Sequence, residues 1–110
     1  DVEALERFLE KAGPVEVPIV AGIWPFLSLR NAEFVANEMP GVVVPAKTVE
    51  RIRSAQASGE DAAIEEGVAI ALEMIEAARP LVQGFHLSTP HRRVDVALRV
   101  LREGGVKDTA

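Results

Sequence analysis

Two short stretches of the chain carry the side chains best suited to recognise a ligand. Residues 22–28 (GIWPFLS) contain the only tryptophan, and residues 86–93 (HLSTPHRR) contain both histidines and two adjacent arginines. An indole ring can stack on a flat organic ring, and an arginine presents a planar fork of donors that suits a carboxylate. The two stretches therefore predict a site for a flat organic molecule or for an anion.

Each of these residues also has an ordinary structural interpretation. Residues 24–26 (WPF) can pack as an apolar strand end beneath a helix, and Asn31 can cap the helix that follows. His86 can be a buried histidine held by hydrogen bonds, and residues 91–93 (HRR) can form a solvated basic turn. The residues alone leave both interpretations open at each of these positions.

Composition excludes or disfavours several kinds of active site. The chain has no cysteine, so thiolate chemistry and disulfides are impossible. Its two histidines do not lie at metal-ligand spacing from any acidic residue, so we expect no metal. It has neither a glycine-rich phosphate loop nor a defensible Ser/His/Asp arrangement. The acids Glu60, Asp61, Glu65 and Glu66 are interpreted as a solvated helix start, because acids near a helix N-terminus favour the dipole.

Size and charge narrow the class of protein further. The chain has 110 residues, 48% of them hydrophobic, and can form one small domain or part of a larger one. Its net charge of -5 disfavours nucleic-acid binding, which needs a basic surface. No apolar run approaches the roughly 20 residues that span a bilayer, and residues 1–11 are too acidic for a signal peptide. We therefore expect no nucleic-acid or membrane partner, and a cytoplasmic location.

Hydrophobic periodicity and turn residues predict alternating helices and strands. The expected elements are a helix over 2–12, a strand over 15–23, helices over 29–38, 46–57 and 60–78, a strand over 84–88, and a last helix that starts at Thr89-Pro90 and ends at Gly104. Ser28 is the expected N-cap of the second helix. Pro18 is awkward inside a strand, and Gly67 inside the longest helix indicates close packing.

This order of elements predicts a parallel strand pair with helical crossovers. Two strands alone make no stable parallel sheet, because both keep an unpaired edge. The chain is therefore expected to be part of a larger α/β barrel or sheet. In such folds ligands bind at the carboxyl ends of the strands, which is where the stretches 22–28 and 86–93 lie.

The amino-acid sequence at these strand ends resembles that of one protein family. VPIVAGIWPFLSLRNAEFVANEMPGVVVP, followed by GFHLSTPHR, is similar to the C-terminal part of 5,10-methylenetetrahydrofolate reductase. The motifs that carry the resemblance are P-I-x-x-G-I-x-P and F-H-x-x-T-x-x-R. The SLRNAEF wording is closest to the form fused behind a homocysteine S-methyltransferase domain, so the parent is expected to carry that second activity too.

The resemblance implies a (β/α)8 TIM barrel, of which residues 1–110 would be a single partial domain holding the last two strands and their helices. Members of the family bind FAD, take hydride from NAD(P)H and reduce 5,10-methylenetetrahydrofolate to 5-methyltetrahydrofolate. The flavin and the catalytic acid belong mainly to earlier strands. We therefore expect this truncated chain alone to be inactive and to hold neither FAD nor NAD(P)H.

The resemblance also implies that the chain supplies the folate side of the site. Asn31 stands where the family often has a glutamine that touches folate. The family's ring-packing phenylalanine falls at Val35 in an ungapped match and at Phe34 after a one-residue slip. Pro90 and Arg92 correspond to an apolar residue and an arginine suited to the glutamate tail. The Asn-for-Gln and Pro-for-Leu differences leave these individual contacts in doubt.

Two other classes of protein compete with the reductase interpretation. The chain could be a self-associating helical interaction module without catalytic activity, although such a module has no use for apolar strand ends. It could also belong to an unrelated phosphate-binding barrel, although residues 88–93 (STPHRR) lack the usual glycines. Under the reductase interpretation, we expect a homo-oligomer that pairs the open sheet edges.

Overall fold

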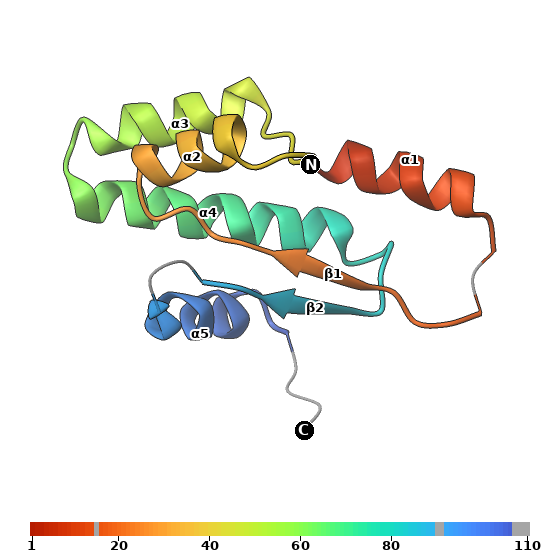
Figure 1. The fold of residues 1–110 in the computed structure, drawn as a ribbon. Coiled ribbons are helices and arrows are strands. Elements are labelled where there is room, and N and C mark those ends of the chain that lie inside the picture. Colours follow the sequence, from red (N-terminus) through yellow and green to blue (C-terminus); the bar gives the residue numbers. More distant parts are fainter. Residues whose placement is uncertain (15, 90–91, 107–110) are drawn as a thin grey trace.

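The computed structural model describes residues 1–14, 16–89 and 92–106 as five helices and two strands (Figure 1). In chain order these are α1 Val2–Ala12, β1 Val20–Ile23, α2 Leu29–Glu38, α3 Ala46–Gln56, α4 Glu60–Ala78, β2 Gly84–Leu87 and α5 Val94–Glu103. The helices expected over 2–12, 29–38 and 60–78 are confirmed, and α3 ends one residue earlier than expected.

The two strands pair in parallel, as the order of elements predicted. Val20 pairs with Gly84, and Ile23 pairs with Leu87. The amide of Ser88 also donates to the carbonyl of Ile23 at 3.0 Å, which continues the pairing beyond β2. The carboxyl ends of both strands therefore meet at one edge of the sheet, as both arrowheads in Figure 1 show.

Among the residues that the structure describes, side chains cover one face of the sheet and leave the other open. Side chains alternate between faces along a strand, and Ile23, Phe85 and Leu87 pack into the main core with α4 and α5. Val20 and His86 belong to the opposite alternation; both are exposed, Val20 by 58%. The parallel pair thus has one packed face and one open face.

The covered face rests on a small apolar core. Its fully buried members from the helices are Ala71 and Ile75 of α4 and Val100 of α5, each with 0% exposure. On the far side of α4, Ile52 buries the inner face of α3. The Arg51 guanidinium joins the same two helices, because its Nε lies 2.7 Å from Glu66 Oε1 and its second terminal nitrogen 2.6 Å from Glu73 Oε2.

Two expectations about element boundaries were wrong. The first strand begins at Val20 rather than at residue 15, since Pro18 has no amide for the ladder and lies in the exposed segment before the strand. The last helix begins at Val94, after Arg92 takes a left-handed φ of 58° that no helix continues. Helix α1 has no buried residue.

Candidate ligand site at the carboxyl edge of the strands

The segment after β1 is held by hydrogen bonds to its own backbone. Ser28 Oγ accepts from the amide of Asn31 at 3.0 Å, so the expected N-cap is confirmed. Asn31 Oδ1 accepts in turn from the amide of Leu27 at 3.3 Å. The carbonyl half of the Asn31 side chain therefore caps the loop, and only its NH2 half remains to meet a ligand.

A third bond to this segment comes from another helix. The amide of Leu29, in the first turn of α2, donates to Gln56 Oε1 of α3 at 2.7 Å. This satisfies one of the N–H groups that every helix start leaves without an intrahelical partner. Nothing in the sequence indicated a role for Gln56, because its partner lies 27 residues away and is a backbone group.

A cavity of about 730 Å³ opens beside the segment. Trp24, Pro25 and Phe26 line it from the end of β1, and Val35 lines it from α2. Its remaining walls come from α1, α3, α4 and the connection over 42–45. This volume lies in the range of small-molecule sites, which are mostly apolar with a few polar groups.

Trp24 also has a side-chain donor without a hydrogen-bond partner in the described part of the chain. This donor is the indole Nε1, which is buried. A buried donor without a partner costs stability. Trp24 thus combines the core packing of its ring with a donor that no described protein group uses.

The two candidate positions for the ring-packing residue differ in exposure. Val35 is 4% exposed and lines the cavity, whereas Phe34 is 54% exposed and turned toward solvent. Adjacent helical residues point about 100° apart, so only one of the two can face the cavity. Of the two, Val35, the position given by the ungapped match, is therefore the one that lines the cavity.

At the end of β2, His86 is exposed rather than buried, so the interpretation of it as a buried histidine was wrong. It lies on the open face of the sheet, which the sequence could not reveal because burial there depends on what covers that face. Pro90 and His91 lie outside the described residues.

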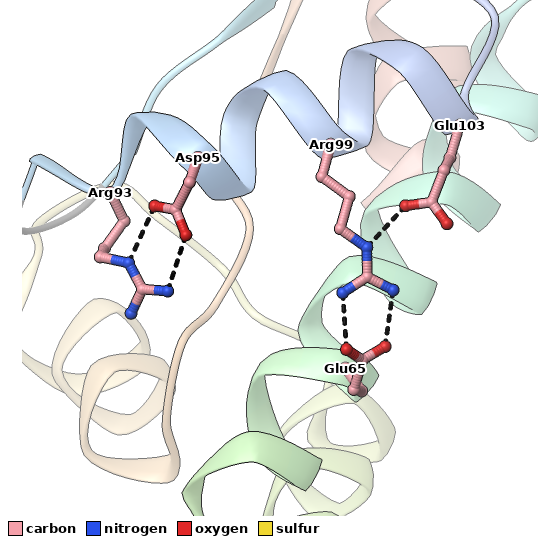
Figure 2. Close-up of polar contacts among 5 residues, drawn as sticks. All are labelled: Glu65, Arg93, Asp95, Arg99 and Glu103. Atoms are coloured by element: carbon pink, nitrogen blue, oxygen red, sulfur yellow. Dashed lines mark hydrogen bonds and ion pairs between the residues drawn. The ribbon is translucent and has the colours of Figure 1, made fainter.

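The two arginines that follow have different surroundings (Figure 2). Arg93 makes a bidentate pair with Asp95, at 3.0 Å from Nε to Oδ1 and 2.9 Å from the terminal nitrogen to Oδ2. The guanidinium of Arg93 lowers the pKa of Asp95, and the carboxylate raises the pKa of Arg93. Arg92 is exposed, has the left-handed φ of 58° and makes no ion pair within the described residues. Of the pair, Arg92 is therefore the one available for an anion.

The acidic cluster has two parts. Glu60 and Asp61 lie exposed in the first turn of α4, as predicted. Glu65 instead bonds Arg99 of α5, with both contacts at 2.6 Å (Figure 2), and Glu66 bonds Arg51. Glu65 stays exposed, as a solvated acid should, whereas Glu66 is half-buried. The sequence did not indicate these ion pairs, because the partner arginines lie on other helices.

The segments that follow β1 and β2 leave the same edge of the sheet; the first leads to Asn31 in the first turn of α2, and the second leads to Arg92 before α5. Neither Asn31 nor Arg92 lines the cavity. Within the described residues no hydrogen bond joins the two side chains, so a molecule that meets both would have to span the edge. Among the described residues no cluster of three His, Asp or Glu side chains could hold a metal ion. None of the described helices is long and apolar enough to cross a membrane.

These features define an α/β protein with helices on one face of a parallel strand pair and candidate binding residues at its carboxyl edge, a layout typical of α/β enzymes. A sequence model of the methylenetetrahydrofolate reductase family matches residues 1–103. The chain therefore belongs to this family of oxidoreductases, whose fold is a TIM barrel. No curated protein was found to match the chain.

Proposed function

We propose that this chain forms the folate-binding side of a reductase that converts 5,10-methylenetetrahydrofolate to 5-methyltetrahydrofolate. Its two strands would be the last two of the family's eight-stranded barrel. The observation that supports the proposal is the shared carboxyl edge of β1 and β2, since both strands lie in the family-matched range and lead into the segments that carry Asn31 and Arg92. The apolar cavity beside Trp24 and Val35 supports a flat ring system as the ligand.

Each residue has a defined task in this proposal. The NH2 group of Asn31 donates to the ring system, while its carbonyl stays on Leu27. Val35 and Trp24 present the apolar wall of the cavity. The guanidinium of Arg92 receives a carboxylate of the glutamate tail. These contacts bind and orient the substrate, and Pro90 would add an apolar contact beside Arg92.

The family generally uses FAD, which supplies hydride to the substrate when it is bound. The described residues do not fit its diphosphate. The N-terminus of α4 carries Glu60 and Asp61, whose charge repels an anion, and no glycine-rich loop precedes any described helix. We therefore assign the flavin and NAD(P)H to other parts of the parent enzyme.

The single tryptophan makes the proposal directly testable. The 110-residue chain is titrated with 5-methyltetrahydrofolate while Trp24 emission and, independently, the heat of binding are recorded. We expect saturable quenching with a matching calorimetric isotherm, and Asn31→Ala and Arg92→Ala should each weaken binding about tenfold, the value of one good hydrogen bond or ion pair. Arg7→Ala, on exposed α1, serves as the control that leaves affinity unchanged.

Absence of any saturable signal, or equal weakening by Arg7→Ala, would refute the proposal. Inorganic phosphate serves as a second titrant, because an unrelated phosphate-binding barrel would bind it at least as well as folate. Fusion to a homocysteine S-methyltransferase domain and a cytoplasmic location remain predictions, which sequencing of the parent gene and cell fractionation would check.

We further propose that the isolated chain self-associates through its open strand edges. The solvent-accessible surface is 7376 Å², whereas a compact monomer of this mass has about 6000 Å². The unpaired edge groups and the exposed Val20 side chain account for part of this excess. The same feature would serve the alternative function of a helical interaction module, which would self-associate without binding folate.

A further inference from the structure

The backbone of α4 touches the backbone of the segment after β1. A Cβ atom built on Gly67 would overlap the carbonyl oxygen of Phe26 and lie 2.9 Å from its carbonyl carbon. Both obstructing atoms belong to the main chain, so no side-chain rotation can relieve the overlap. At this position, only glycine permits the observed approach of Phe26 to α4.

The position of Gly67 in the helix makes this contact notable. It is buried near the middle of the 19-residue α4, where glycine is less favourable than alanine. The backbone is ordinary helix, so the need for glycine does not come from a left-handed φ. The close approach of the Phe26 backbone is the physical reason for a glycine at this position.

The same segment is fixed at two neighbouring points. The amide of Leu27 donates to Asn31 Oδ1, and the amide of Leu29 donates to Gln56 Oε1. Together with the Phe26 contact, residues 26, 27 and 29 are held by α4, α2 and α3, respectively. Trp24 and Pro25 precede this anchored segment immediately, and Asn31 follows it.

We propose that Gly67 is a positioning residue for the ligand site. Because Gly67 lets the Phe26 carbonyl contact the backbone of α4, it fixes the position of Trp24 at the cavity. It also fixes the position of Asn31 at the start of α2. Gly67 itself lines the cavity from α4, next to Ile70 and Ala71. The effect on folate affinity rests on the proposed function, whereas the effect on Trp24 does not.

The test compares Gly67→Ala with Gly84→Ala. In the control, the added Cβ meets only Val20 Cγ2 at an ordinary 3.9 Å. We expect both variants to keep the helical far-UV circular dichroism. Only Gly67→Ala should shift Trp24 emission, increase its quenching by acrylamide and weaken 5-methyltetrahydrofolate binding about tenfold, because the displaced rim loses at least one polar contact.

The outcomes separate the two claims. If the wild-type chain fails to bind folate, the proposed function fails. The acrylamide comparison still tests whether the contact between Gly67 and Phe26 positions Trp24. If Gly67→Ala leaves Trp24 emission and quenching unchanged, the positioning role of Gly67 is refuted. If Gly67→Ala does not fold, amide exchange of the wild-type chain decides. Leu27 and Leu29 should then be as protected as α4, and rapid exchange of both overturns the proposal.

Discussion

At the scale of single residues, the best-determined feature is the start of α2. Ser28 has an extended backbone, and its hydroxyl accepts from Asn31 at 3.0 Å. Loss of a Ser N-cap costs about 1 kcal/mol of stability. We therefore expect Ser28→Ala to lower the free energy of unfolding by about that amount, measured by urea denaturation. Ser54→Ala, exposed in the last turn of α3, is the matched control and should not destabilise.

Residue-level prediction succeeded where the relevant contact is local. The Ser28 cap follows from its place before a helical pattern, because its partner is three residues away. The choice between Phe34 and Val35 could not be made from the sequence, since both are apolar and one register slip exchanges them. The structure separates the two by burial, and burial depends on how α2 packs. Gln56 was missed for the same reason, because its partner is distant in sequence.

At the scale of elements, ion pairs fasten α5 to α4 (Figure 2). The guanidinium of Arg99 bonds both oxygens of Glu65 at 2.6 Å and Glu103 Oε2 at 2.7 Å. These bonds lower the pKa of Glu65 from its usual 4.5. A carboxylate whose pKa is lower in the folded state stabilises above the unfolded pKa, and this contribution disappears as pH falls through the folded value.

Glu65→Gln should therefore destabilise the chain at neutral pH and leave it with a weaker loss of stability below about pH 4.5 than the wild type shows. The urea midpoint measured across pH at low salt checks this. The difference between the two proteins should also shrink at about 1 M salt, where the Debye length is only about 3 Å. Glu10→Gln on α1 leaves the Glu65–Arg99 pair intact, so its urea midpoint should differ from that of the wild type by the same amount at every pH and salt concentration. A change equal to that of Glu65→Gln would contradict the assignment.

The apolar contact of α4 is a larger contributor than its ion pairs. Ile75 has 0% exposure and lies in the core that joins α4, α5 and β1. Replacement of a fully buried Ile by Ala costs about 2–5 kcal/mol, so Ile75→Ala should unfold at much lower denaturant. Val94→Ala, 58% exposed on α5, should change stability by no more than about 0.5 kcal/mol. Comparable losses in both variants would show that this core is not packed as described.

Element-level prediction succeeded for order and failed at boundaries. Helices and strands alternate strongly enough in hydrophobic pattern to give the parallel pairing. The start of α5 was misplaced because Thr89-Pro90 has the composition of a helix start, whereas the left-handed Arg92 delays the helix to Val94. The left-handed conformation of Arg92 outweighed the preference for proline in the first turn of a helix, which many helices do follow.

At the scale of the whole molecule, the described residues leave one face of the sheet open. The Cα radius of gyration is 14.3 Å, above the roughly 13 Å of a compact chain of this length. This openness could not be read from the sequence, because a strand pair gives the same pattern whether or not other strands cover it. The family barrel explains the pattern: Val20 and His86 would face the interior that further strands close.

The last prediction concerns how the isolated chain hides this face. Unpaired parallel edges beside an exposed apolar side chain favour association, so sedimentation of the 110-residue chain should show a mass that rises with concentration. Val20→Lys, which places a charge on the open face, should shift the equilibrium toward monomer. Val17→Lys, 67% exposed but outside β1, should not. A compact monomer at every concentration would contradict self-association through the open strand edges. It would imply that the chain is stable with one sheet face exposed to solvent.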